Sequence, residues 1–230
     1  MKVAIIIPAR LASTRLPNKP LAMIDGKPMV IHVMQAAMAA NIGEVIVATD
    51  SIEIAYFVDA FGGSVVGTGA CATGTDRVQI AAQFTDAELI VNVQGDLPTI
   101  RPEDIRAVVH QPFLPVIATL AAPLQEGDAL NPNVVKVAGN RLDETHIRCQ
   151  AFSRGMLDNA LHHVGVYAYR RGTLDWFVSA EQTPNERRES LEQLRAMDAG
   201  MDIDATLIER APQSVDTFED LQKVIAELEQ

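Results

Sequence analysis

The sequence predicts a mixed α/β fold with a mostly parallel sheet, helices on both faces and an inserted antiparallel portion. In the first half, short apolar runs rich in β-branched residues alternate with helix-like segments, as in parallel sheets that are buried on both faces. In the second half, strand-like runs are joined by loops instead of helices. Because no internal repeat or Gly/Ser-rich linker is present, we expect a single domain over residues 1–230.

Local signals predict each element of the first half, about residues 1–112. Residues 3–7 form an apolar run that ends at a proline, which favours a buried strand. A proline followed by good helix formers predicts a helix over residues 28–40. The same alternation predicts strands at 45–48, 64–66 and 89–93, a helix capped at 50–51 that runs to about 61, a loop at 67–75, and helices from 76 and over about 102–110.

The second half, about residues 113–230, has a different pattern. Strands are expected at 116–121, 134–137, 147–152, 164–169 and 203–208, and helices at 174–180, 186–199 and 218–229. One mixed α/β domain fits this pattern better than two independent domains.

Composition excludes several classes of protein. Of the 230 residues, 48% are hydrophobic and 21% are charged, which argues against intrinsic disorder. A chain of this length can bury a core without a disulfide or a metal staple. The 30 acidic and 19 basic residues give a net charge of −11, so we expect no broad adhesion to nucleic acid or to anionic membranes.

Cysteines and apolar runs indicate the expected compartment. Cys71 and Cys149 lie far apart without a CxxC pattern, so neither a disulfide framework nor a zinc site is expected. The apolar run near the N-terminus is shorter than a signal peptide requires, and no run reaches the roughly 20 residues of a membrane helix. We therefore expect a soluble cytoplasmic protein.

The first candidate site follows the first strand, where open parallel sheets bind their ligands. Arg10, Arg15 and Lys19 lie within ten residues there, and Ser13 and Thr14 add hydroxyl groups. Such a loop can wrap a polyphosphate with charges, side-chain donors and backbone N–H groups. Neither a Walker A loop nor a GxGxxG fingerprint is present. A solvated basic loop is the alternative, and the position directly after a buried strand weighs against it.

Two further segments carry candidate ligands. Thr75 or Asp76 is expected to cap a helix, and Arg77 in its first turn is unfavourable for the helix dipole, which favours a role in binding an anion. Asp96 follows a buried strand beside Gly95, as a Mg²⁺ ligand could, although a turn before a proline is an equally good interpretation.

The residues late in the chain are ambiguous when taken alone. A single Asp binds Mg²⁺ weakly, so a second carboxylate such as Asp216 is expected to help. Spacing alone favours Asp216 as the N-cap of the last helix, Glu192 as part of a solvated helix face and His163 as a structural histidine.

Taken in order, these segments resemble the 3-deoxy-manno-octulosonate cytidylyltransferases (CMP-Kdo synthetases). The matching stretches, which run from about Lys2 to about Leu221, are IPARLASTRLPNKPLAMIDGKPMVIHV, VATD, FGG, TGTDR, VNVQGD, NPNVVKV, FSR, HHVGVYAYR, LEQLR and VDTFEDL. The resemblance implies a nucleotidyltransferase-type, Rossmann-like fold, a homodimer and a requirement for Mg²⁺. It also implies transfer of CMP from CTP to the anomeric hydroxyl of the sugar acid Kdo, release of pyrophosphate and a product used in lipopolysaccharide assembly in Gram-negative bacteria.

The resemblance also implies roles for individual residues. It assigns about residues 1–112 to nucleotide binding and about 113–230 to sugar binding and dimerisation. The residues matched to CTP binding are Ala9, Arg10, Ser13, Arg15, Lys19, Thr75, Arg77 and Gln94. Those matched to the sugar pocket are Arg154, His163, Tyr167, Glu192 and Gln193. Asp96 and Asp216 match the metal-binding aspartates, and Arg10, Lys19 and Asp96 are expected to carry catalysis.

The sequence departs from the family pattern at three places, and these departures bear on which sugar is bound more than on the binding of CTP. Cys71 stands where the family has His in HxSGTDR, and Leu97 stands where it has Glu in QGDEP. Only eight residues, 155–162, separate the FSR motif from His163, where the family has a longer segment. A related amino sugar, another keto acid sugar and reduced activity therefore remain open.

Two rival functions also remain. One is a different nucleotidyltransferase or a glycosyltransferase that uses sugar nucleotides. The Arg/Lys loop after the first strand favours binding of a free triphosphate over the glycosyltransferase function. The other is a homologue that binds nucleotide without turnover, against which the presence of Lys19, Asp96 and Asp216 weighs.

Overall fold

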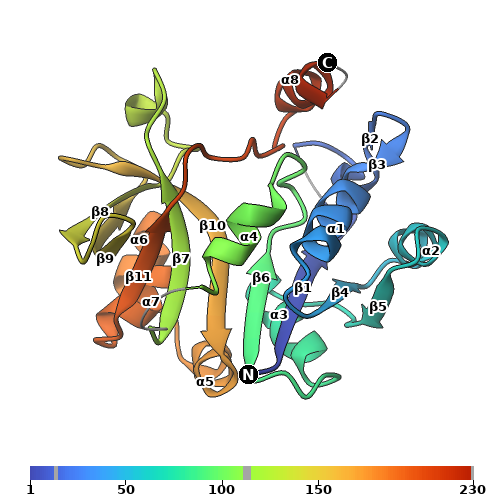
Figure 1. Ribbon diagram of the computed structural model, residues 1–230, viewed down its shortest axis with the longest axis horizontal. Coiled ribbons are helices and arrows are strands. Elements are labelled where there is room, and N and C mark those ends of the chain that lie inside the picture. The colour runs from blue at the N-terminus through green and yellow to red at the C-terminus, as the bar shows by residue number, and fades with distance from the viewer. Residues whose placement is uncertain (13–14, 111–114, 229–230) are drawn as a thin grey trace. The chain divides into compact units, whose positions relative to one another are not determined.

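The computed structural model describes residues 1–12, 15–110 and 115–228 (Figure 1). It has two compact units, of which the first comprises Met1–Arg106 and Pro212–Gln230 and the second Ala107–Ala211. The second unit is therefore an insertion into the first. The sequence interpretation placed everything after about residue 112 in one half, whereas the chain beyond residue 211 belongs to the first unit. It returns there because Val215 and Val224 pack on Leu16, Ile24 and Met29.

The first unit contains a four-stranded parallel sheet. Its order is β5 (Ser64–Gly67), β4 (Glu44–Thr49), β1 (Val3–Ala9) and β6 (Leu89–Val93). β1 is central, and Ile6 pairs with Ile46 on one side and Asn92 on the other. The side chains at both faces of β1 are buried, which is why this strand has an uninterrupted apolar sequence instead of an alternating one.

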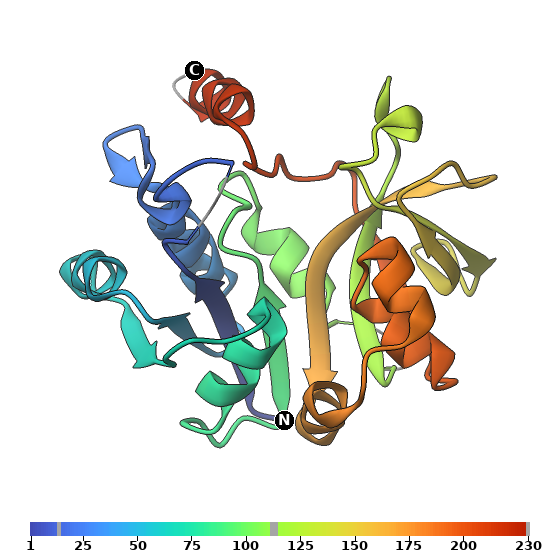
Figure 2. The same cartoon turned by 180° about the vertical axis from the view of Figure 1, so that it is seen from behind.

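Helices cover both faces of this sheet, as predicted. α1 (Met29–Ala40) lies in front of the strands in Figure 1, and α3 (Gly74–Ala82) lies in front of them in Figure 2, which shows the opposite side. The other helices of the unit are α2 (Ile52–Ala60), α4 (Pro102–Ala107) and α8 (Phe218–Leu228). A 3₁₀ helix, η1 (Lys19–Leu21), and two short paired strands, β2 (Met23–Ile24) and β3 (Lys27–Pro28), were not predicted, because two-residue strands have no periodicity to detect.

The second unit has five strands that close on themselves. Their order is β10 (Leu161–Arg170), β7 (Ile117–Ala122), β11 (Ile203–Leu207), β9 (His146–Ser153) and β8 (Lys136–Arg141), and β8 also pairs with the start of β10. Only the β7–β11 pair is parallel among the described pairings of this unit. This unit is the inserted antiparallel portion, so the predicted mixed α/β fold is confirmed.

The helices of the second unit correct one prediction. They are η2 (Asp128–Leu130), α5 (Arg171–Ser179), α6 (Pro184–Glu189) and α7 (Gln193–Asp198). The single helix expected over 186–199 was wrong, because Ser190 has a left-handed backbone (φ 54°) and ends α6. Among the described residues, no helix combines the length and the apolar character that crossing a bilayer requires.

Candidate functional site

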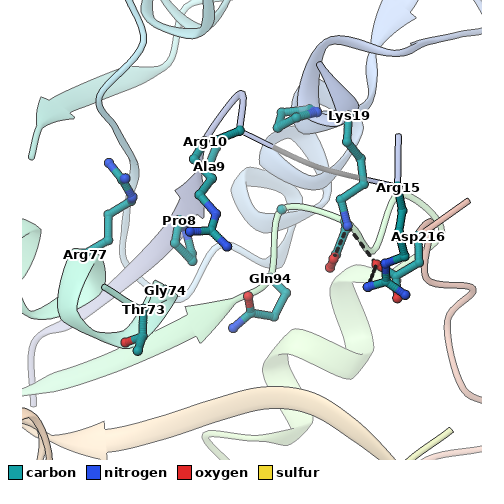
Figure 3. A pocket seen from close by; sticks show the side chains of 14 residues that line it. Pro8, Ala9, Arg10, Arg15, Lys19, Thr73, Gly74, Arg77, Gln94 and Asp216 are labelled. Carbon is teal, nitrogen blue, oxygen red and sulfur yellow. Dashed lines mark hydrogen bonds and ion pairs between the residues drawn. The ribbon is translucent and has the colours of Figure 1, made fainter. Parts of the chain in front are cut away.

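The first unit contains a cavity of about 370 Å³ where β1 and β6 end and α3 begins (Figure 3). This is the edge of a parallel sheet at which ligands are expected. The residues that line it are Pro8, Ala9, Arg10, Ala12, Arg15, Lys19, Pro20, Thr73, Gly74, Arg77, Gln94, Gly95, Asp96 and Asp216. The lining has four cations and two carboxylates, so this cavity is locally cationic in a chain of net charge −11.

Gly95 allows the loops after β1 and β6 to approach each other closely. A Cβ atom at this position would lie 2.9 Å from the backbone oxygen of Pro8, which real Cβ atoms do not tolerate. Glycine is therefore required where the loop after β6 crosses the end of β1. The close approach brings Asp96 to the side of the cavity that Lys19 occupies.

Lys19 joins the two predicted metal-binding aspartates. Its Nζ donates hydrogen bonds to Asp96 Oδ2 at 2.8 Å and to Asp216 Oδ1 at 3.0 Å. Arg15 Nη2 lies 3.0 Å from the same oxygen of Asp216. Lys19 and Asp216 are 197 residues apart in the sequence, so only the fold brings them together. The two carboxylates therefore face a shared point.

The charge on Lys19 is stabilised in this setting. The lysine side chain is only 16% exposed, and this burial is the strongest single influence on its pKa, which it lowers. The Asp96 and Asp216 carboxylates together outweigh burial and raise the pKa of Lys19 above its ordinary value. Lys19 is consequently a permanent cation at the cavity wall.

Asp216 is not the N-cap of α8, contrary to the prediction from spacing. Thr217 has that position, since its hydroxyl accepts a hydrogen bond from the Asp220 backbone N–H at 3.2 Å. The Asp220 carboxylate in turn accepts from the Thr217 backbone N–H at 2.9 Å, which completes a capping box. The carboxylate of Asp216 is thereby left to pair with Lys19 and Arg15.

The start of α3 also differs from the prediction. The N-cap is Thr73, which forms a capping box with Asp76, so Thr75 does not cap the helix. Arg77 is 2% exposed and pairs with Asp50 at 2.9 Å. Its guanidinium also donates to the Thr68 hydroxyl and the Gly69 backbone oxygen. Arg77 lines the cavity and at the same time holds the loop after β5.

The remaining residues predicted to bind nucleotide are placed as follows. Ala9, Arg10 and Gln94 line the cavity, and Arg10 has no ion-pair partner among the described residues, so its charge is available to an anion (Figure 3). Gln94 is oriented by a hydrogen bond from its Nε2 to Asn92 Oδ1 at 3.3 Å. Thr75 is buried in α3 and is not among the lining residues. Ser13 lies outside the described residues.

The predicted sugar residues all lie in the second unit. His163 and Tyr167 belong to β10, in a row of rings that also contains Phe152 and Tyr169. Burial, with a smaller contribution from His162, lowers the pKa of His163 to about 3, so this imidazole is neutral at physiological pH. Burial also raises the pKa of Tyr167 well above its ordinary value, so its phenol keeps its proton.

Arg154 is bound to backbone carbonyl groups. Its guanidinium donates to Glu189 O at 3.0 Å, Pro132 O at 3.2 Å and Ser190 O at 3.3 Å. Arg154 thus connects the loop before β8 to the turn between α6 and α7, and that turn precedes the next two predicted residues. Glu192 is half-buried at the start of α7, and Gln193 is 6% exposed with no hydrogen-bond partner for Nε2 among the described residues.

Sequence reasoning missed several residues that shape these regions. Lys136 is 1% exposed, and its Nζ donates to Asn131 O, Val134 O and Arg154 O at 2.8–2.9 Å. A lysine next to valines in a strand-like run was the available signal. Pro8, Ala12, Pro20, Thr73 and Gly74, which also line the cavity, carry no charge by which they could have been singled out.

Two of the three departures from the family pattern, Cys71 and Leu97, lie in the first unit, and the shortened segment 155–162 lies in the second. Leu97 is 6% exposed and thus part of the packed interior. Cys71 is half-buried, and its thiol lies 3.7 Å from Thr68 O, near the carbonyl group that Arg77 contacts. Neither residue lines the cavity.

Comparisons with known proteins identify the family of this chain. The cytidylyltransferase family profile matches residues 4–203. The 3-deoxy-manno-octulosonate cytidylyltransferase of Rhodopseudomonas palustris (strain BisB18) is 49% identical over 233 residues, 96% of this chain and 95% of that protein. The solved structure of CMP:2-keto-3-deoxy-manno-octonic acid synthetase complexed with CTP is 38% identical, with a TM-score of 0.92 over 100% of this chain and 99% of that chain.

The fold extends to more distant proteins. The 4-diphosphocytidyl-2C-methyl-D-erythritol synthase of Anaerococcus prevotii is 12% identical, with a TM-score of 0.70 over 100% of this chain and 99% of that chain, a likeness that concerns the fold alone. The nucleotidyltransferase-type fold and the family resemblance predicted from the sequence are thereby confirmed. This chain belongs to the cytidylyltransferase family, and within it to the 3-deoxy-manno-octulosonate cytidylyltransferases.

Proposed function

We propose that this protein joins CMP from CTP to a 3-deoxy keto acid sugar, Kdo, and releases pyrophosphate. The observation that carries the proposal is the cationic cavity at the end of β1 and β6, whose lining includes Arg10, Arg15 and Lys19 beside two carboxylates. The relatives named for this reaction and the related structure with CTP support the same nucleotide.

Electrostatics makes the cavity suitable for a nucleoside triphosphate. CTP has about four negative charges, and charge-assisted hydrogen bonds from Arg and Lys bind phosphate oxygens strongly. Arg10 has no competing ion pair among the described residues, and Arg15 is 55% exposed, so both can turn toward a phosphate. We therefore assign triphosphate binding to Arg10, Arg15 and Lys19.

The carboxylates suit a magnesium ion. Asp96 and Asp216 direct oxygen atoms at one shared cation, the ammonium of Lys19, and hard oxygen ligands are those that Mg²⁺ prefers. No cluster of three or more His, Cys, Asp or Glu residues suitable for a metal occurs in the described part of the chain. This agrees with Mg²⁺, which commonly uses one or two carboxylates together with substrate phosphates. When bound, the ion would neutralise phosphate charge and acidify a nearby hydroxyl.

The reaction itself is a displacement at the α-phosphorus. The anomeric oxygen of the sugar forms a bond to this phosphorus while the bond from this phosphorus to the oxygen of the leaving pyrophosphate breaks, and the proton of the sugar hydroxyl passes to water. Arg10, Arg15 and Lys19 hold the phosphates in line and stabilise the charge that develops on the leaving pyrophosphate. His163 is a poor general base, because its pKa is lowered to about 3, so we assign it to contact with the sugar.

The residues that we assign to sugar binding lie in the second unit. We assign Tyr167, Glu192 and Gln193 to the sugar with His163, and we assign Arg154 to holding the turn before Glu192 through its three carbonyl contacts. A cytoplasmic location, a homodimer and a product destined for lipopolysaccharide are proposed from the family resemblance. Size-exclusion chromatography with light scattering tests the dimer, and a monomeric mass would contradict it.

Pyrophosphate release tests the proposed function. The purified protein is mixed with CTP, Mg²⁺ and a panel of sugars that contains Kdo, an amino analogue of Kdo, another keto acid sugar and a sugar without a keto acid group. We expect rapid release with Kdo or a close relative and none with sugars that lack the keto acid. Tight CTP binding without release in the presence of any sugar would refute the proposal and favour a binding protein.

A further inference from the structure

The packing of β7 against β10 contains an irregularity beside His163. The register shifts between Val164 and Tyr167, so the strand bulges there. Thr119, in β7, is fully buried opposite this bulge. Its Oγ1 lies 2.8 Å from Val166 O, 3.2 Å from Val164 O and 3.1 Å from His163 Nε2.

The single proton of the Thr119 hydroxyl determines how these contacts can be satisfied. Both carbonyl oxygens are acceptors only, so the hydroxyl must donate to one of them, and Val166 O is the closer. If the hydroxyl donated to His163 instead, its lone pairs would face two buried carbonyl oxygens, which is unfavourable. The contact with His163 therefore has Nε2–H as donor and Oγ1 of Thr119 as acceptor.

A neutral imidazole that has its proton on Nε2 has a lone pair on Nδ1. His163 has no hydrogen-bond partner for Nδ1 among the described residues. The ring is held by Phe152, edge to face at a centroid distance of 5.0 Å, and by Tyr167 at 5.5 Å. Burial, with a smaller contribution from His162, disfavours protonation of the ring. His163 thus presents one fixed acceptor.

We propose that Thr119 is a positioning residue that fixes the Nε2–H tautomer of His163, so that Nδ1 accepts a hydrogen bond from a sugar hydroxyl. This inference rests on the proposed function, because it takes the sugar to be the ligand of His163. An acceptor at this point selects a hydroxyl donor and disfavours analogues in which that hydroxyl is methylated or absent.

The tautomer is measurable on the protein without ligand. Nitrogen-15 labelling of the five histidines, with His163→Gln to identify the signals of His163, shows which ring nitrogen carries the proton. We expect Nε2 to be protonated and Nδ1 to be unprotonated, and we expect the same for Thr119→Ser. Protonation of Nδ1 in the unmodified protein would overturn the proposal, whatever the variants do.

The sugar contact is tested by adding CTP and Kdo. The Nδ1 resonance of His163 should shift as it accepts a hydrogen bond. In Thr119→Val the KM for the sugar should rise about tenfold with the KM for CTP changed less than twofold, and Thr119→Ser should restore it. Thr206→Val is the matched control, because it removes another buried threonine hydroxyl of the same unit, which donates to Ala107 O.

The outcomes separate the two proposals. An unshifted Nδ1 resonance while pyrophosphate is released, or an equal rise in both KM values, would overturn the role of Thr119. Absence of pyrophosphate release with every sugar would overturn the proposed function and with it the sugar contact. The tautomer of the free protein would still be decided by its own spectrum.

Discussion

Replacing Lys19 with methionine should weaken triphosphate binding and strengthen the binding of a divalent ion alone. The variant keeps the length of the side chain but removes the ammonium that lies 2.8 Å from Asp96 and 3.0 Å from Asp216. At an effective dielectric constant of about 20, each contact has a gross Coulomb energy of about 5–6 kcal/mol. Without the ammonium, the two oxygens, which lie at most about 6 Å apart, would repel by at least about 3 kcal/mol.

The net effect on stability is smaller than these gross energies. Lys19 is 16% exposed and the two aspartates about 30%, so desolvation and solvent screening offset much of the attraction. Exposed pairs contribute about 0–1 kcal/mol, and removal of one partner from a buried pair costs about 3–5 kcal/mol. We therefore expect the free energy of unfolding of Lys19→Met to fall by about 2 kcal/mol in the absence of divalent ions.

The decisive comparison adds Mg²⁺ and CTP separately. Mg²⁺ alone should restore much of the lost stability, because it can take the place of the ammonium between the carboxylates. The Kd for CTP, measured by calorimetry, should rise at least tenfold, since hydrogen bonds to charged groups contribute about 1.5–3 kcal/mol. Lys27→Met is the matched control, because Lys27 donates to Gln35 and does not line the cavity. If Mg²⁺ stabilised Lys19→Met and Lys27→Met equally, or if Lys19→Met had an unchanged Kd for CTP, the reasoning would be refuted.

Three further variants test other parts of the account. Asp96→Asn should leave the Kd for CTP within threefold but lower kcat by about 100-fold or more, as for loss of a preorganised electrostatic group, and undiminished turnover would exclude the metal role. Arg154→Lys cannot reach three carbonyl groups, so hydrogen exchange at residues 190–193 should accelerate and the KM for the sugar should rise, whereas unchanged exchange would contradict the bridging role. Burial lowers the pKa of His163 in the folded protein to about 3. Between pH about 6.5 and about 3, therefore, the imidazole of residue 163 takes up a proton in the unfolded chain but not in the folded protein. Stability should therefore decrease over that window, and it should decrease less in His163→Gln; identical curves for the two proteins would contradict the pKa.

The sequence was most informative where local patterns decide the structure. The apolar run over residues 3–7 predicted β1, because a strand that is buried on both faces has an uninterrupted apolar sequence. Ser51 predicted the start of α2, because serine is a preferred N-cap residue. The cations after β1 were also identifiable, since three of them stand out in an acidic chain. Asp96, with Asp216 as a second carboxylate, was a magnesium candidate from the residues alone, and the family resemblance added their assignment as metal-binding aspartates.

Other features depend on tertiary packing and have no local signal. Asp216 and Thr217 are both acceptable N-caps, and only the contacts of Asp216 with Lys19 decide between them. Ser190 interrupts a helix-like pattern with a left-handed backbone that the sequence does not demand. The role proposed for Thr119 depends on a bulge in the neighbouring strand β10. The bulge lies beside His163, which is 44 residues from Thr119 in the sequence.

Isotope tracing of CTP tests the central claim, nucleotidyl transfer to a sugar hydroxyl, most directly. The protein is incubated with Kdo, Mg²⁺ and CTP that carries radioactive phosphorus at either the α or the γ position, and the products are separated by chromatography. The account predicts that the α label appears in a cytidine–sugar product and the γ label in pyrophosphate, in equal amounts. A γ label on the sugar, or α label found only in free CMP, would contradict it.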